Sequence, residues 1–161
     1  MSFTAKVSTQ GKDLLMSIEG VMDENCELPA IPAGLSGELR IDLQKLLLIN
    51  SLGARKWVTW ILRGAEAKGG VVLLNCPAVF VHQINILAGF LPDFARVESF
   101  YAPYYCDSCG FEDSVLYVRG KDFDANESRI PESRPCPSCG GQEEFDMVLE
   151  RYLKFIYKKT A

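Results

Sequence analysis

Residues 39–74, LRIDLQKLLLINSLGARKWVTWILRGAEAKGGVVLL, decide the fold of this chain. Residues 38–43 alternate between apolar and polar side chains, which predicts a half-buried strand. Residues 71–74 are continuously apolar and follow two glycines, which predicts a central strand covered on both faces. A helical pattern separates the two, so the stretch predicts a strand–helix–strand crossover between parallel strands.

The crossover helix is defined by apolar residues that recur every three or four positions. They are Ala54, Trp57, Val58, Ile61, Leu62 and Ala65. Ser51 can cap the start of this helix, and Gly69-Gly70 ends it. Trp60 falls outside the apolar stripe and lies one turn after Lys56, which predicts that both side chains share the exposed face of the helix. The alternative is that Trp60 belongs to the rim of the core, as aromatic residues at the edge of an apolar stripe usually do.

The elements on either side of the crossover complete an α/β pattern. Residues 3–8 and 14–19 flank a turn and predict an opening hairpin. A second helix is expected after Pro77, and a last strand over 96–101. The prolines and glycines of residues 25–37 allow at most a short helix. Residues 1–104 are therefore predicted to form one domain with a mixed sheet and helices packed against it.

Length, composition and charge exclude several classes of protein. With 161 residues, 48% hydrophobic and 24% charged, the chain can bury a core, which excludes a disordered or disulfide-dependent miniature protein. Its net charge of −4 disfavours direct nucleic-acid binding. The longest apolar run, 70–91, is too polar to span a membrane, and the first residues do not resemble a signal peptide. We therefore expect a cytoplasmic protein that does not insert into membranes.

Two Cys-x-x-Cys-Gly units carry the strongest chemical signal. Cys106 and Cys109 form one pair, and Cys136 and Cys139 form the other. Each pair can direct two thiolates at one ion, and four sulfurs complete a tetrahedral shell with no open position for water. The sequence thus predicts a structural zinc site in a second, zinc-ribbon-like module over residues 105–161, closed by a helix over 143–159.

Iron is the alternative metal for these cysteines. The two knuckles also resemble rubredoxin, which would make the module an iron redox centre attached to the first domain. Cys26 and Cys76 have no paired neighbour and are expected to be ordinary thiols. A closed metal site and a lone histidine, His82, leave no set of acid, base and nucleophile, so the chain is not expected to be an enzyme.

Four short motifs in the first domain resemble the STAS domain in order and spacing. They are IEGVMD at 18–23, LRIDL at 39–43, INSLG at 49–53 and KGGVVLL at 68–74. The family comprises anti-sigma factor antagonists and the cytoplasmic domains of sulfate transporters. The resemblance implies an α/β domain with a four- or five-stranded mixed sheet and helices mainly on one side.

The resemblance also implies a regulatory role in signal transduction. In that family a kinase-like anti-sigma factor binds the antagonist and phosphorylates a hydroxyl before a helix, and Ser51 matches the acceptor. Asn50 stands where the family usually has aspartate. An anti-sigma factor or sensor-kinase-like partner would then contact Asp23, Asn50, Ser51, Lys56 and Trp60. From the residues alone, Ser51 is either a helix cap, a phosphorylation site, or both.

Overall fold

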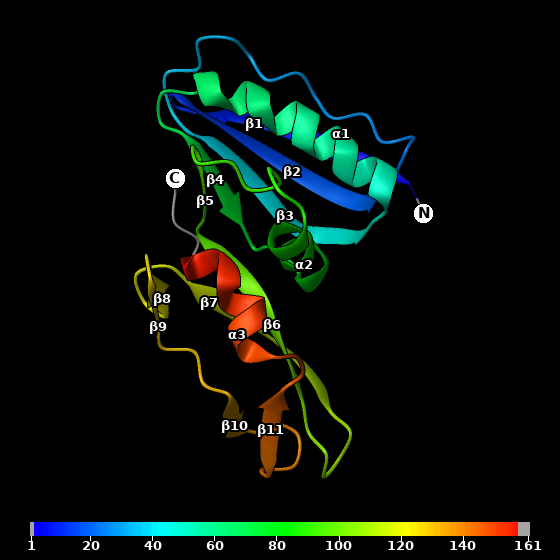
Figure 1. Cartoon of the computed structure of the whole chain (residues 1–161). Helices are drawn as coiled ribbons and strands as arrows, with labels where there is room; N and C mark the ends of the chain where they lie inside the picture. Colours follow the sequence, from blue (N-terminus) through cyan, green and yellow to red (C-terminus); the bar gives the residue numbers. More distant parts are fainter. Residues whose placement is uncertain (1, 158–161) are drawn as a thin grey trace.

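The computed structural model describes residues 2–157 and contains a five-stranded sheet, a four-stranded sheet and a two-stranded ribbon (Figure 1). The first sheet is built from β1 (Phe3–Gln10), β2 (Asp13–Met22), β3 (Leu39–Ile49), β4 (Val71–Leu74) and β5 (Ala95–Val97). The other strands are β6 (Ser99–Tyr105), β7 (Glu112–Val118), β8 (Phe123–Asp124), β9 (Glu127–Ser128), β10 (Ser133–Pro135) and β11 (Gln142–Phe145). The helices are α1 (Ser51–Ile61), α2 (Ala78–Ile86) and α3 (Leu149–Tyr152), with 3-10 turns at Leu62–Glu66 and Leu153–Tyr157. The chain is therefore a mixed α/β protein.

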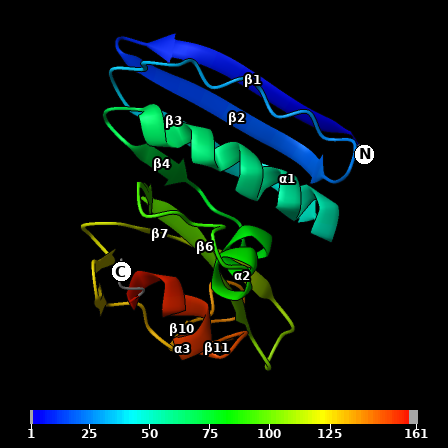
Figure 2. The same ribbon diagram turned by 45° about the horizontal axis from the view of Figure 1, so that its top comes forward.

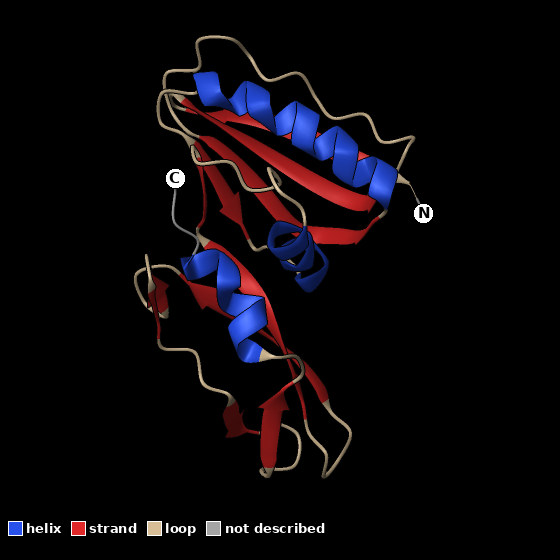
Figure 3. Ribbon diagram, viewed as in Figure 1, coloured by secondary structure: helices blue, strands red, loops and turns tan. Residues whose placement is uncertain are grey.

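The first sheet has the order β1-β2-β3-β4-β5. The opening hairpin is antiparallel, as predicted, and the remaining neighbours are parallel. Successive parallel strands joined by right-handed crossovers place their helices on one face of the sheet, and α1 and α2 lie on the same side in Figures 1 and 3. The predicted crossover over 39–74 is confirmed.

Strand β3 is longer than the alternating pattern predicted. It continues to Ile49 beside β2, whereas its other neighbour, β4, pairs with it only up to Asp42. The last part of the strand, an apolar run at 46–49, therefore extends past the covered part of the sheet. Leu47 and Leu48 are each 51% exposed as a result.

Helix α1 is covered on two sides. Trp57 faces the sheet, is fully buried, and donates its indole N–H to the Phe90 carbonyl at 2.9 Å. The prediction that Trp60 is exposed is wrong, since only 7% of this residue is accessible. Its indole N–H donates to the Pro29 carbonyl at 2.7 Å, because the irregular segment 23–38 runs along α1 and covers it (Figure 2).

The end of the crossover helix also differs from the prediction. At Leu62 the chain tightens into a 3-10 turn, which changes the direction of the following side chains. Leu62 is 57% exposed, and Ala65 is exposed too, although both belong to the apolar pattern. Gly64 faces the core instead, where an added Cβ would lie 2.7 Å from Val71.

The second sheet, in the order β10-β11-β6-β7, is joined directly to the first part of the chain. The backbone N–H of Cys76 donates to the Ser99 carbonyl at 3.0 Å, and the N–H of Tyr101 donates to the Cys76 carbonyl at 2.8 Å. One cluster of buried side chains runs through both parts. The predicted domain boundary after Tyr104 falls inside β6, and division into two domains stays a prediction.

The predicted single helix over 143–159 is wrong. Residues 142–145 form β11, and helical structure begins only at Leu149; residues 158–159 lie outside the described part. Glu143 is fully buried in this strand beside Arg134, with 3.0 Å between Nε and Oε1. The segment after β11 docks on β6, because Tyr152 donates its hydroxyl to the Tyr101 carbonyl. The polar stretch 120–135 contains β8, β9 and β10.

Gly53 allows the close approach of α1 to the end of β2. A Cβ at this position would lie 2.0 Å from the Met22 carbonyl oxygen, which also accepts the Asn50 N–H. We therefore expect Gly53→Ala to lower the free energy of unfolding by about 2 kcal/mol or more, because backbone must move. Helix propensity alone would raise it by about 1 kcal/mol. Urea denaturation shows whether Gly53→Ala lowers or raises the free energy of unfolding. Ser51→Ala, at an exposed position, should change the free energy of unfolding by less than about 0.5 kcal/mol.

Candidate metal centre and Ser51 corner

The four predicted cysteines come together at the tips of two hairpin-like turns. Cys106 and Cys109 lie between β6 and β7, and Cys136 and Cys139 lie between β10 and β11. The turns have the same hydrogen bonds. Gly110 N–H donates to the Cys106 carbonyl at 2.8 Å, and Gly140 N–H donates to the Cys136 carbonyl at 2.9 Å. Both glycines have positive φ, at 78° and 76°, which explains why glycine follows each pair.

The sulfur positions fit a tetrahedral ion. All four Sγ atoms lie within 4.8 Å of one another. Cys106 and Cys139 are 3.6 Å apart, and Cys109 and Cys136 are 3.7 Å apart. Zinc–sulfur bonds of about 2.3 Å in a tetrahedron put neighbouring sulfurs about 3.8 Å apart. These separations are too long for disulfides, so the four thiols can hold a metal ion.

The electrostatics of the thiols suit a cation. The backbone N–H of Cys109 lowers the pKa of Cys106 to about 7. The Gly141 amide lowers the pKa of Cys139, but the neighbouring Cys106 and Cys109 sulfurs raise it overall to about 12. Four closely spaced thiolates repel one another, and a metal ion between them offsets that repulsion. Burial raises the pKa of Cys26, which lies elsewhere and remains an ordinary thiol, as predicted.

The second candidate site is the Ser51 corner, which we define as Asp23, Glu24, Asn50, Ser51 and Leu52. Asn50, not Ser51, is the cap of α1, and its side-chain oxygen accepts the Gly53 N–H at 2.8 Å. Ser51 is the first helical residue and is exposed. Within residues 2–157 its hydroxyl has no hydrogen-bond partner, so the expectation that Ser51 caps the helix is wrong.

A carboxylate that the sequence analysis missed belongs to this corner. Asn50 Nδ2 donates to Glu24 Oε2 at 2.9 Å. The same hydrogen bond lowers the pKa of Glu24, so the carboxylate is charged beside the start of α1. The Asp23 backbone is close too, because its nitrogen would lie 2.9 Å from a Cβ on Gly53. Leu52, next to Ser51, and Leu48, near the end of β3, are exposed leucines close to this corner in the sequence.

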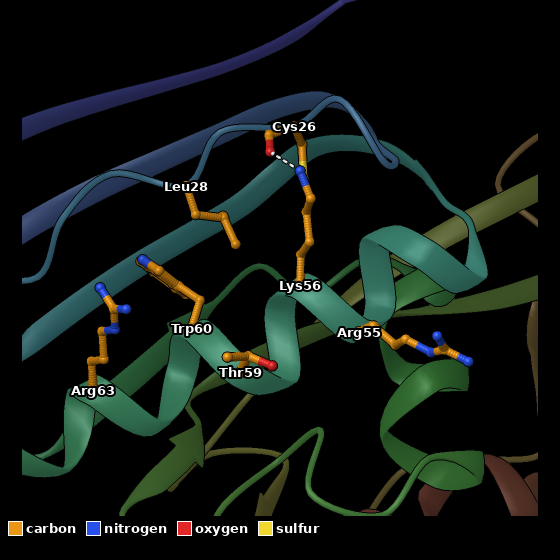
Figure 4. A pocket seen from close by; sticks show the side chains of 7 residues that line it. All are labelled: Cys26, Leu28, Arg55, Lys56, Thr59, Trp60 and Arg63. Atoms are coloured by element: carbon orange, nitrogen blue, oxygen red, sulfur yellow. Dashed lines mark hydrogen bonds between the residues drawn. The ribbon is translucent and has the colours of Figure 1, made fainter.

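Lys56 and Trp60 lie further along the same helix and line one hollow. We call it the α1 hollow; its volume is about 380 Å³, and it is lined by Cys26, Leu28, Arg55, Lys56, Thr59, Trp60 and Arg63. Lys56 is exposed, as predicted, and its ammonium donates to the Cys26 carbonyl at 3.0 Å (Figure 4). Of the predicted partner residues, Ser51, Lys56 and Trp60 thus lie along α1, Asn50 is its cap, and Asp23 follows β2.

Some of the residues that the sequence analysis missed do leave a signal in the sequence. Arg55, Thr59 and Arg63 recur every four positions, a spacing that brings side chains close together on a helix surface. The apolar run at 46–49 departs from strict alternation and marks the point where β3 leaves its covered neighbours. Glu24 leaves no such signal, because its hydrogen bond with Asn50 joins residues 26 positions apart.

No family model and no curated protein matches the sequence. Among residues 2–157, none of the helices combines the length and apolar character needed to cross a lipid bilayer. His82 is exposed on α2. The metal centre, the Ser51 corner and the α1 hollow are therefore the candidate functional sites.

Metal content should depend on the four clustered cysteines only. We expect protein purified without added metal to carry one ion per chain, and Cys139→Ser to lose it, because one of four ligands is removed. Cys26→Ser is the matched control and should retain the ion, since Cys26 is buried away from the cluster. Mass spectrometry of the metal gives the amount and identifies zinc or iron. Equal loss in both variants would contradict the assignment of the ligands.

Because Asn50 and not Ser51 caps α1, substitutions at these two neighbouring positions should change the stability by different amounts. We expect Asn50→Ala to lower the free energy of unfolding by about 1 kcal/mol, because the Gly53 N–H loses its acceptor. Thermal and urea unfolding of Asn50→Ala and Ser51→Ala measure the difference. A larger loss in Ser51→Ala than in Asn50→Ala would show that the serine hydroxyl is the cap.

Proposed function

We propose that this chain is a regulatory protein-binding domain resembling the anti-sigma factor antagonists, controlled by phosphorylation of Ser51. The observation that carries the proposal is the state of the Ser51 side chain. It is exposed at the start of a helix, it is not the cap, and no described residue binds its hydroxyl. A kinase can therefore reach this hydroxyl without opening the fold.

The surroundings of Ser51 support a docking surface. Leu52, 46% exposed, follows Ser51 directly, and Leu48, 51% exposed, lies near the end of β3 opposite Val21 of β2. Exposed apolar residues that gather with polar neighbours are typical of protein interaction sites. A partner that covers these leucines would also cover the serine.

Phosphorylation of Ser51 would act on such a complex by charge. A phosphate carries about two negative charges at neutral pH, and the free amides at the start of α1 favour it in the unbound protein. Inside a complex the same phosphate would lie beside Glu24, Asp23 and the partner's covering surface, where water is excluded. The modification therefore favours the free protein over the complex.

The metal centre has a structural role in this proposal, and zinc is the ion we assign to it. Four thiolates leave no open coordination position, so a bound ion supplies folding energy and no Lewis acid. Binding of this kind contributes on the order of 10 kcal/mol to the folding of a small module. The two turns it would join are otherwise connected through β6 and β11, which share two residue pairs.

The test compares variants of Ser51 in the native cell. We expect the tagged chain to co-purify with an anti-sigma factor or kinase, and Ser51→Asp to reduce the recovered partner about tenfold. Ser51→Ala should retain the partner and lose the phosphate that mass spectrometry detects in the unmodified sequence. Ser36→Asp is the matched control, because Ser36 is an exposed serine away from the corner. Phosphate found elsewhere, with unchanged recovery in Ser51→Asp, would remove the switch.

A further inference from the structure

We infer that the α1 hollow binds an acidic segment of the partner protein, an extended stretch in which two carboxylates flank an apolar side chain. The inference rests on the proposed function to the extent that the same partner covers Ser51. The hollow begins one helical turn after that serine.

Two cations of the hollow have no partner within residues 2–157. Three of the hollow's side chains are cations, and none is a carboxylate. Lys56 is bound to the Cys26 carbonyl, but Arg55 and Arg63 form neither an ion pair nor a hydrogen bond through their side chains. Five of the six other arginines, at positions 40, 96, 119, 129 and 134, lie in ion pairs, and the sixth, Arg151, is exposed in α3 and does not line the hollow. The hollow is therefore a positive patch on a chain whose net charge is −4.

The acids of segment 23–38 leave the two arginines unpaired. Glu24 interacts electrostatically with Lys56, and Glu27 lines a different hollow, together with Asp23 and the start of β1. Figure 4 shows Lys56, Trp60 and Arg63 extending toward the segment, while Arg55 extends from the other side of α1. The cations thus border the hollow at separate points and leave its middle apolar.

Leu28 and the ring of Trp60 supply that apolar surface. The indole N–H of Trp60 is already bound to the Pro29 carbonyl, so the ring offers an incoming group only its apolar surface. A single apolar side chain of a partner can pack there, in the manner of a small interface anchor. A free inorganic anion would leave this surface unused.

The distance between Arg55 and Arg63 sets the spacing that the two carboxylates of the partner segment must have. Arg55 lies in α1 and Arg63 lies in the 3-10 turn that follows it, eight positions later. At about 1.5 Å per residue in the helix and about 2.0 Å in the turn, their Cα atoms are about 13 Å apart along the axis. An extended segment advances about 3.3 Å per residue, so the matching carboxylates lie about four positions apart. Three cations over this distance are too few for duplex DNA, which carries a charge about every 1.7 Å.

Ser51 and Arg55 are four positions apart on α1, so their side chains are neighbours on the helix surface. A phosphate on Ser51 would pair with the Arg55 guanidinium, and that pairing would withdraw the guanidinium from the partner's carboxylate. The phosphate would also repel the carboxylate directly. Phosphorylation would therefore weaken binding in the hollow itself, in addition to its effect at the exposed leucines.

The test uses a short fluorescent peptide with two glutamates about four positions apart around a leucine, and the full-length unphosphorylated protein. We expect saturable binding that weakens about tenfold in Arg55→Ala/Arg63→Ala and with rising salt. Lys12→Ala/Lys121→Ala is the matched control, because it removes two exposed cations outside the hollow. Thermal unfolding of all variants checks that the fold is kept.

Three outcomes would overturn the assignment. They are equal weakening in both double variants, equal binding of a peptide with glutamine in place of glutamate, and tighter binding of inorganic phosphate or a DNA oligonucleotide that depends on Arg55 and Arg63.

The Ser51 switch is tested separately, with protein carrying phosphoserine at position 51. We expect this protein to bind the peptide about tenfold more weakly, and the added effect to disappear in Arg55→Ala. If cells contain no Ser51 phosphate but the peptide still needs Arg55 and Arg63, the switch fails and the hollow stands.

Discussion

The close contact between the start of α1 and the end of β2 sets the position of the Ser51 corner and of the α1 hollow. Gly53 lies against the Met22 carbonyl, and the same carbonyl accepts the Asn50 N–H at 3.1 Å. A side chain at position 53 would push the helix off the sheet. With glycine there, the helix starts directly beside the β2–β3 segment, so Glu24 reaches Asn50 and leaves Ser51 outside the network. The exposed hydroxyl is thus a consequence of backbone packing.

The covering of α1 from two sides explains which faces remain for binding. The sheet takes Ala54, Trp57 and Ile61, and segment 23–38 takes Trp60. The residues left exposed are Ser51, Leu52, Arg55, Lys56, Thr59, Leu62 and Arg63. A segment without regular structure can hold this position because its carbonyls at Cys26 and Pro29 accept hydrogen bonds from Lys56 and Trp60. The Ser51 hydroxyl and the cations that follow it are consequently displayed along one helical stretch, with Glu24 beside its start.

The sequence predicted the elements whose pattern is local. The opening hairpin, the crossover over 39–74 and the four clustered cysteines are marked by alternation, helical periodicity and paired spacing. Trp60 was misplaced because segment 23–38 has no period that would reveal where it packs. Asn50 and Ser51 are equally good caps by residue type, and the hydrogen bond from the Gly53 N–H to the Asn50 side chain shows that Asn50 is the cap. The helix over 143–159 failed because Phe145 fits the helical spacing although it belongs to a strand.

The metal centre and the Ser51 corner lie far apart, and we propose a structural role for the first and a role in partner binding for the second. In Figures 1 and 2 the turns that join β6 to β7 and β10 to β11 lie at the opposite end of the molecule from α1. An ion at those turns would hold the second sheet together, and that sheet contacts the first part of the chain through the backbone of Cys76, which is bound to Ser99 and Tyr101 of β6. None of these three residues lines the α1 hollow. The ion can therefore keep β6 in place as a support for α2 and α3, while charge at Ser51 is free to change without disturbing the metal.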